Sequence, residues 1–160
     1  MIVRRLRDSG HVSYFAGGCV RDELLGLAPT DYDVATDAPP QRIQSLFKRT
    51  AEVGAAFGVV LVTPGKEEGA ADRVTVEVAT FRSDGPYSDS RRPDVVTFST
   101  PEADAKRRDF TVNALFLDPL DETLRPGGRV IDFVGGEADL KRRVIRAVGD
   151  PEARLAEDHL

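Results

Sequence analysis

Two aspartates in the sequence Asp31-Tyr32-Asp33 are spaced so that they could act together on one substrate. The segment 31–36 predicts a β-strand, in which residues i and i+2 point to the same face. Two carboxylates on one face suit Mg²⁺, which binds few protein carboxylates and keeps positions for phosphate oxygens and water. Two such ions polarise an attacking hydroxyl and neutralise a leaving pyrophosphate. Because an Asp-x-Asp pair also occurs by chance at solvent-exposed strand ends, the metal hypothesis depends on the residues around it.

A glycine pair, Gly17-Gly18, follows an apolar segment that predicts a strand over 11–16. Glycines let backbone N–H groups approach a phosphate closely, and the helix predicted over 19–25 would point its positive end at the same place. Arg21 adds a guanidinium for phosphate oxygens. The alternative is an ordinary strand-to-helix turn, since the segment lacks the G-K-[ST] of a Walker loop and the spacing of a dinucleotide fingerprint.

A third acidic residue, Glu77, interrupts the β-branched segment 74–81, which predicts the clearest strand in the chain. Glu77 falls on the face opposite the valines. An unpaired carboxylate is costly to bury, but it is tolerated beside a metal ion or an arginine. Glu77 is therefore a candidate third carboxylate of the site, and the alternative is a solvated strand face.

A fourth group of polar residues lies in the segment 107–114, Arg-Arg-Asp-Phe-Thr-Val-Asn-Ala. We predict a helix over 100–115, with Thr100 as its N-cap, and on that helix Asp109 and Asn113 would share a face. Arg108 would stand close by and complete a set able to hold a phosphate and a ribose hydroxyl. The alternative is a helix stabilised by local ion pairs.

The elements that would position these groups alternate between helices and short strands, which predicts an α/β (α+β) fold with a small mixed sheet flanked by helices. The remaining expected elements are helices over 2–8, 41–47 and 137–148, a strand over 95–98, a strand pair or bent strand over 50–62, a mobile loop over 82–93, a hairpin over 117–134 and a final helix from residue 152.

Composition describes a soluble globular chain of 160 residues with 41% hydrophobic and 31% charged residues. No apolar run is long enough to span a membrane, and the first residues lack a secretory signal, so we expect no membrane association. The single cysteine, Cys19, excludes a disulfide framework and favours the cytoplasm. A net charge of −5 argues against a dedicated nucleic-acid-binding domain, although local basic clusters are present.

Taken in order, the motifs read G-G-x-x-R-D-x-L-L-G-x-x-P-x-D-x-D-x-A-T, V-E-V-A-T-F-R, Y-x-D-x-R-R-P and R-R-D-F-T-x-N-A. This series resembles the head domain of class II tRNA nucleotidyltransferases and bacterial poly(A) polymerases, both of the DNA polymerase β superfamily. The resemblance extends over residues 15–158. It implies the DNA polymerase β-type nucleotidyltransferase fold.

The resemblance also implies roles for individual residues. Asp31 and Asp33 would hold Mg²⁺ and, with Glu77, form the catalytic set. The incoming triphosphate would contact Gly17, Gly18 and Arg21. The nucleotide and its sugar would lie at Arg108, Asp109 and Asn113, and the base edge would be read by Asp158.

The implied activity is template-independent addition of C, A or both to the 3′ end of tRNA, from CTP and ATP and with release of pyrophosphate. Residues 1–150 would form the catalytic head and 151–160 the truncated start of the neck, with the remaining neck, body and tail domains missing. The segment 53–62 favours a CCA-type enzyme. The alternatives are a poly(A) polymerase head or a non-catalytic nucleotide-binding module of the same fold.

Overall fold

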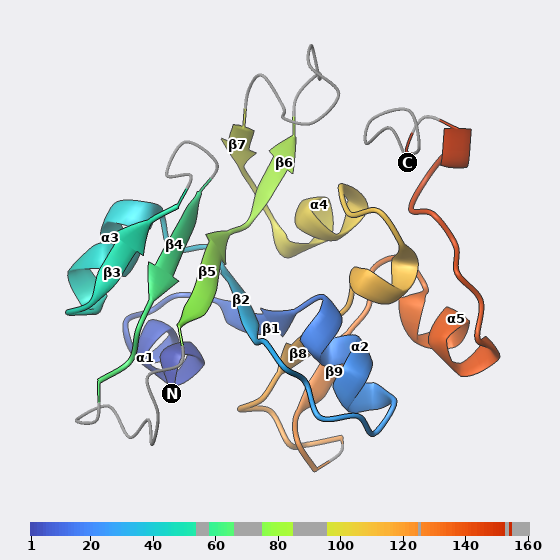
Figure 1. Ribbon diagram of the computed structural model, residues 1–160, viewed down its shortest axis with the longest axis horizontal. Helices are drawn as coiled ribbons and strands as arrows, with labels where there is room; N and C mark the ends of the chain where they lie inside the picture. Colours follow the sequence, from blue (N-terminus) through green and yellow to red (C-terminus); the bar gives the residue numbers. More distant parts are fainter. Residues whose placement is uncertain (54–57, 66–74, 85–95, 125, 153, 155–160) are drawn as a thin grey trace.

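The computed structural model describes residues 1–53, 58–65, 75–84, 96–124, 126–152 and 154. Within them a seven-stranded mixed sheet has the order β3-β4-β5-β2-β1-β8-β9, and β6 and β7 form a separate two-stranded ribbon (Figure 1). The strands are β1 (Ser13–Ala16), β2 (Asp33–Thr36), β3 (Thr50–Glu52), β4 (Val59–Val62), β5 (Val76–Thr80), β6 (Arg82–Asp84), β7 (Val96–Phe98), β8 (Phe116–Asp118) and β9 (Arg129–Ile131).

Two helices, α1 (Ile2–Asp8) and α3 (Pro40–Leu46), cover one face of this sheet. Their apolar side chains, such as Leu6 and Ile43, pack with Val34 of β2 and Val78 of β5 in one buried cluster. Because strand side chains alternate between faces, the residues on either side of Val34 and Val78 point to the other face. This first layer therefore fixes which face of the sheet carries Asp33 and Glu77.

The opposite face is covered by α2 (Gly18–Leu24), α4 (Pro101–Lys106), the 3₁₀ turn η3 (Thr111–Asn113) and α5 (Gly136–Arg142), which lie on the right in Figure 1. Phe81 and Phe116 meet edge to face in this layer, with ring centroids 5.9 Å apart. The burial of these aromatic rings against Ala105 of α4 and Ala114 fixes the segment between them.

The helix predicted over 100–115 is wrong beyond Lys106. Thr100 caps α4 as expected, since its hydroxyl accepts from the N–H of Ala103 at 3.2 Å. Phe110 is extended and forms an isolated antiparallel bridge with Ala147. The helix predicted over 137–148 likewise ends at Arg142, because the chain after it returns as the partner of this extended segment.

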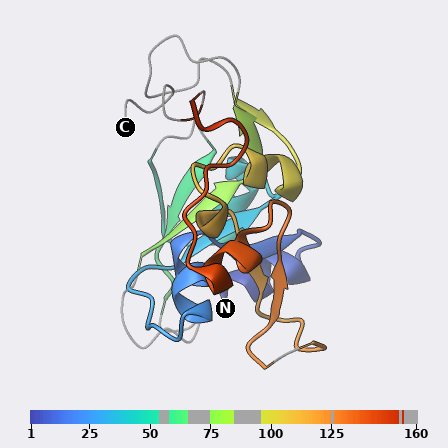
Figure 2. The same cartoon turned by 90° about the vertical axis from the view of Figure 1, so that its right-hand side faces the viewer.

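Figure 2 views the molecule from the right-hand side of Figure 1. It shows the chain after α5 running along the layer formed by α2, α4, η3 and α5. The N–H of Thr111 donates to the carbonyl of Arg146 and the N–H of Val148 donates to that of Asp109, both at 2.9 Å. These pairings satisfy backbone groups that a continuous helix would have satisfied internally. They place Asp109 and η3 by contacts that are distant in sequence.

Other boundaries differ less. The strand pair over 50–62 and the hairpin over 117–134 are confirmed as β3–β4 and β8–β9. The loop predicted over 82–93 begins instead as β6, which pairs with β7, and positions 85–93 lie outside the described residues. The strand predicted over 31–36 begins only at Asp33. In the described part of the chain, no helix is long and apolar enough to cross a membrane.

Candidate nucleotidyl-transfer site

The glycine elbow connects β1 to α2. Gly17 has a φ of +75° and its N–H donates to the carbonyl of Leu115 at 3.0 Å, so the elbow is fixed to the chain just after η3. A Cβ atom at this position would lie 2.9 Å from Nη1 of Arg108. Glycine is required here both for the left-handed backbone and for the close approach of that guanidinium.

Asn113 joins the two arginines that the sequence assigned to phosphate and nucleotide. Its side-chain Oδ1 accepts from Nη1 of Arg21 at 2.7 Å, and its main-chain carbonyl accepts from Nη1 of Arg108 at 3.0 Å. Its Nδ2 donates to Oδ1 of Asp109 at 3.4 Å. The structure therefore brings Arg21, Arg108, Asp109 and Asn113 together around Gly17, although the continuous helix expected to align them is absent.

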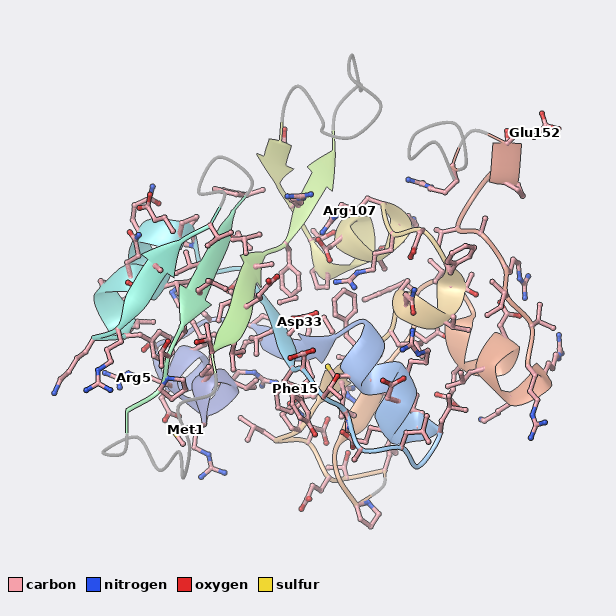
Figure 3. The ribbon with its side chains drawn as sticks, viewed as in Figure 1. Met1, Arg5, Phe15, Asp33, Arg107 and Glu152 are labelled. Carbon is pink, nitrogen blue, oxygen red and sulfur yellow. The ribbon has the colours of Figure 1, made fainter. Side chains whose placement is uncertain are left out.

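Two carboxylates stand side by side on adjacent strands. In the parallel pairing of β2 with β5, Asp33 is the register partner of Glu77, and Figure 3 labels Asp33 at the start of β2. Register partners in a parallel pair point to the same face, and both residues are exposed. The expectation that Glu77 lies on the face opposite the valines is confirmed, since Val78 is buried on the other side.

Asp33 also lies close to the elbow and to Arg108. Desolvation by the surrounding protein raises the pKa of the Asp33 carboxyl, the charge of Arg108 lowers it, and the charge of Asp31 raises it. Burial raises the pKa of the Cys19 thiol on α2, hydrogen bonding to the backbone of Asp33 and Ala16 lowers it, and the Asp33 charge raises it slightly. Asp33 thus lies opposite Ala16, the residue before the elbow, and its carboxyl feels the charge of Arg108.

The prediction that Asp31 and Asp33 project from one strand is wrong, because Asp31 lies outside β2. Among the described residues, the pairings of β2 with β1 and with β5 both begin at Asp33 and do not extend back to Asp31. Asp31 is exposed just before β2, and its Oδ2 accepts from the Thr30 hydroxyl at 3.3 Å. Asp31 still contributes its charge to Asp33, as the pKa of Asp33 records.

The donor set suits a hard divalent cation. Asp33 and Glu77 offer carboxylate oxygens from one face, and Mg²⁺ is commonly held by one or two carboxylates together with substrate phosphates. Across the described residues, no three His, Cys, Asp or Glu side chains are grouped to enclose a metal ion. The site is therefore an open carboxylate pair to which a nucleotide could add its own oxygens, and not a closed metal cage.

One buried carboxylate at the site was missed from the sequence. Asp104 is only 2% exposed and accepts from Arg108 through its Oδ2 at 3.3 Å. The signal was present, because an Asp and an Arg four residues apart lie on one face of a helix. Asp158, in contrast, lies outside the described residues.

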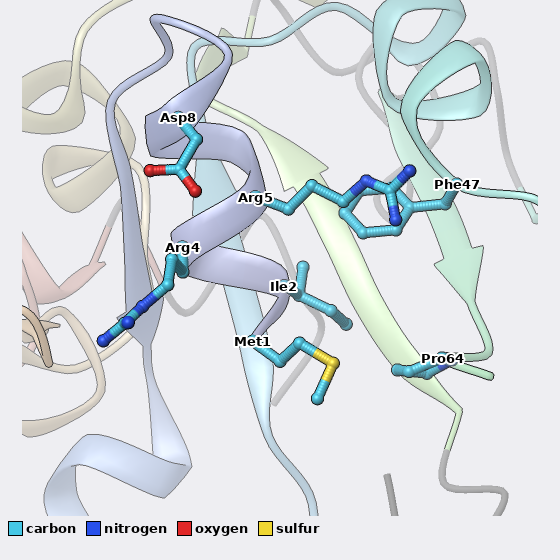
Figure 4. Close-up of a pocket in the computed structure, with 7 residues that line it drawn as sticks. All are labelled: Met1, Ile2, Arg4, Arg5, Asp8, Phe47 and Pro64. Carbon is cyan, nitrogen blue, oxygen red and sulfur yellow. The ribbon is translucent and has the colours of Figure 1, made fainter. Parts of the chain in front are cut away.

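A hollow of about 380 Å³ lies elsewhere, between α1 and the end of α3 (Figure 4). Met1, Arg5 and Phe47 are among its lining residues, and the Arg5 guanidinium lies 5.3 Å from the centroid of the Phe47 ring. Since α1 and α3 cover the face that carries Val34, this hollow is separated by the sheet from the Asp33–Glu77 face. It is not an entrance to the candidate site.

A mixed sheet that presents carboxylates beside a glycine elbow and inward-held arginines is the arrangement of a nucleotidyltransferase head domain. Residues 13–146 match the sequence model of the family described as the Poly A polymerase head domain. Because that match covers most of the chain, the chain belongs to this family. Nucleotidyltransferases of this kind generally use divalent metal ions.

Similar proteins carry a more specific name. The chain is 44% identical to a CCA-adding enzyme of Geobacillus thermodenitrificans over 99% of its own length and 36% of that enzyme. It is 45% identical to one of Levilactobacillus brevis over 99% of its length and 37% of that enzyme. It thus spans about a third of these relatives.

Solved structures of CCA-adding enzymes have a fold similar to that of this chain. The Bacillus stearothermophilus CCA-adding enzyme in complex with CTP superposes with a TM-score of 0.81 at 38% identity, over 99% of this chain and 34% of that one. The Thermotoga maritima CCA-adding enzyme complexed with tRNA gives a TM-score of 0.72 at 25% identity, over 99% of this chain and 33% of that one. The fold expected from the sequence is confirmed.

Proposed function

We propose that this chain is the catalytic head of a template-independent nucleotidyltransferase that adds C, A or both to the 3′ end of tRNA. The observation that carries the proposal is the Asp33–Glu77 pair beside the elbow at Gly17. Arg21 and Arg108, held together through Asn113, supply positive charge at the same place. This combination supports transfer of a nucleotide from a triphosphate, because it provides metal ligands and phosphate-binding cations side by side.

Asp33 and Glu77, with the Asp31 charge nearby, would hold Mg²⁺, which would supply Lewis-acid activation of the RNA 3′-hydroxyl and charge neutralisation of the pyrophosphate. The protein itself binds and orients the nucleotide. Phosphate oxygens would lie against the elbow backbone at Gly17 and Gly18 and against the Arg21 and Arg108 guanidinium groups.

Asp109 and Asn113 would contact the ribose and the nucleotide. Their mutual hydrogen bond and the contact of Asn113 with Arg21 keep the polar groups fixed before substrate arrives. Such preorganisation lowers the barrier because little rearrangement remains to be done during the reaction. Asp158 would belong to an element that reads the base edge.

The CCA-adding activity is favoured over poly(A) synthesis because the similar curated proteins at 44% and 45% identity are CCA-adding enzymes. The solved relative with CTP and the relative with tRNA support CTP and the tRNA 3′ end as substrates, and addition of A requires ATP as well. A non-catalytic module would not need the acidic pair, so its presence favours an enzyme. We place the activity in the cytoplasm, in keeping with a single cysteine and hence no disulfide framework.

The test is an extension assay on a tRNA that lacks its terminal CCA. The enzyme assayed is the natural protein that contains this chain. Each of the four NTPs is supplied with Mg²⁺, and the products are sized. We expect incorporation of C and A that disappears in both Asp31→Ala and Asp33→Ala. Incorporation that persists in both variants would remove the metal-dependent assignment, and addition of A alone to any RNA would favour the poly(A) alternative.

A further inference from the structure

Asp104 on α4 is a buried carboxylate with three donors. Its Oδ1 accepts from Nε of Arg107 at 2.9 Å and from the N–H of Arg82 at 3.3 Å. Its Oδ2 accepts from Nη2 of Arg108 at 3.3 Å. A carboxylate this buried is costly unless it is paired, and the two guanidinium groups supply the compensating charge. Asp104 thus joins the start of the β6–β7 ribbon, α4 and Arg108 at one point.

The Arg108 guanidinium is held on several sides. Besides Asp104, it contacts the carbonyl of Asn113 through Nη1, and its Cζ lies 5.3 Å from the centroid of the Phe116 ring. Its Nε is buried and has no hydrogen-bond partner among the described residues. Without Asp104, one edge of this guanidinium would lose the charged acceptor that sets its orientation.

The orientation of the Arg108 guanidinium affects the surroundings of the glycine elbow. Nη1 of Arg108 occupies the space next to Gly17 that a Cβ atom would enter, and the charge of Arg108 acts on the Asp33 carboxyl. A small rotation of the guanidinium would therefore alter the surface offered to a triphosphate. Arg107, the other cation on Asp104, instead uses Nε for that contact and lies beside the C-terminal end of α4.

We propose that Asp104 is a positioning residue for nucleotide binding, which acts by orienting Arg108 toward the glycine elbow. This inference rests on the proposed function, in that Arg108 is taken to contact the nucleotide. It does not make Asp104 a group that touches substrate. Its effect on affinity should pass entirely through Arg108.

A double-mutant cycle on CTP affinity tests this, with titration calorimetry in the presence of Mg²⁺. The variants are Asp104→Asn, Arg108→Gln and the double substitution, with Arg107→Gln as the matched control because it removes the other guanidinium on Asp104. We expect Asp104→Asn to weaken CTP binding by about tenfold, as the loss of a charge-assisted hydrogen bond does. In the Arg108→Gln background the same substitution should change affinity by less than about twofold.

Equal losses from Asp104→Asn in both backgrounds would overturn the proposal and indicate a structural role alone, as would an equal loss in Arg107→Gln. Asp104→Glu keeps the carboxylate and should bind CTP nearly as tightly as the wild type does. This variant provides the test of the proposal if Asp104→Asn fails to fold. A folded Asp104→Glu with affinity as weak as that of Arg108→Gln would also contradict the proposal. Failure of the wild-type chain to bind CTP would be a different result, because it would count against the proposed function.

Discussion

Arg21 on α2 and Asn113 at the end of η3 are joined by a 2.7 Å hydrogen bond between residues 92 positions apart. This contact fixes the elbow helix to the turn that also accepts from Arg108. Arg21 and Arg108, the cations proposed to bind phosphate, are consequently held by protein contacts before any nucleotide arrives.

Asn113→Asp should weaken CTP binding by roughly tenfold or more, because a carboxylate would neutralise Arg21 and repel the neighbouring Asp109. The measurement is CTP affinity with Mg²⁺ present. Gln41→Glu is the matched control, since it makes the same charge change at an exposed position on α3, behind the sheet. Equal affinities in the two variants would show that Asn113 does not organise the site.

Gly17→Ala should displace Arg108, because the added Cβ would stand 2.9 Å from its Nη1. The control is Gly10→Ala, which imposes alanine at a comparable φ of +87° where nothing lies within 4 Å. Both changes should lower the free energy of unfolding through backbone strain, by about 1–3 kcal/mol each. Only Gly17→Ala should also lower CTP affinity, and a similar affinity loss in Gly10→Ala would point to general destabilisation.

Glu77→Gln should raise the Mg²⁺ concentration needed for half-maximal nucleotide binding by about tenfold, the size of effect seen when a group that supports a metal is removed. We expect this effect because Glu77 and Asp33 are register partners in the β2–β5 pair and point to the same face. Glu52→Gln on the distant strand β3 makes the same change outside the site. An unchanged Mg²⁺ requirement in Glu77→Gln would assign Glu77 to a solvated strand surface.

Asp139 provides a prediction on stability. Its buried carboxylate accepts from Arg146 and from the hydroxyl of Thr111 at 2.7 Å, and these hydrogen bonds, that of Arg146 first, lower its pKa. A lowered pKa contributes stability that is fully present above the ordinary Asp value and is lost as the pH falls through the folded-state value. Asp139→Asn should therefore lower Tm at neutral pH.

The Tm difference should shrink as the pH falls below the ordinary value of 3.8. Thermal unfolding of both proteins across this acidic range is the measurement. A difference that stays constant down to the lowest pH at which the protein folds would contradict the assignment of this stability to the ionised carboxylate.

Local patterns in the sequence predicted much of the site and failed where distant segments decide the backbone. The elbow at Gly17, the strand that carries Glu77 and the cap at Thr100 follow from local chemistry, and the structure confirms them. The segment 107–113 has helical spacing, yet it leaves the helix because its backbone pairs with the chain after α5. No local spacing reveals such a partner, since the pairing depends on residues more than thirty positions away.

The Mg²⁺ dependence of CTP binding in wild type and Asp33→Asn tests the central claim most directly, because asparagine keeps the size of the side chain and removes its charge. Affinity is measured for each protein with Mg²⁺ and with a chelator. The account predicts that Mg²⁺ tightens binding to the wild type and leaves binding to Asp33→Asn unchanged. An equal Mg²⁺-dependent gain in both proteins would contradict it.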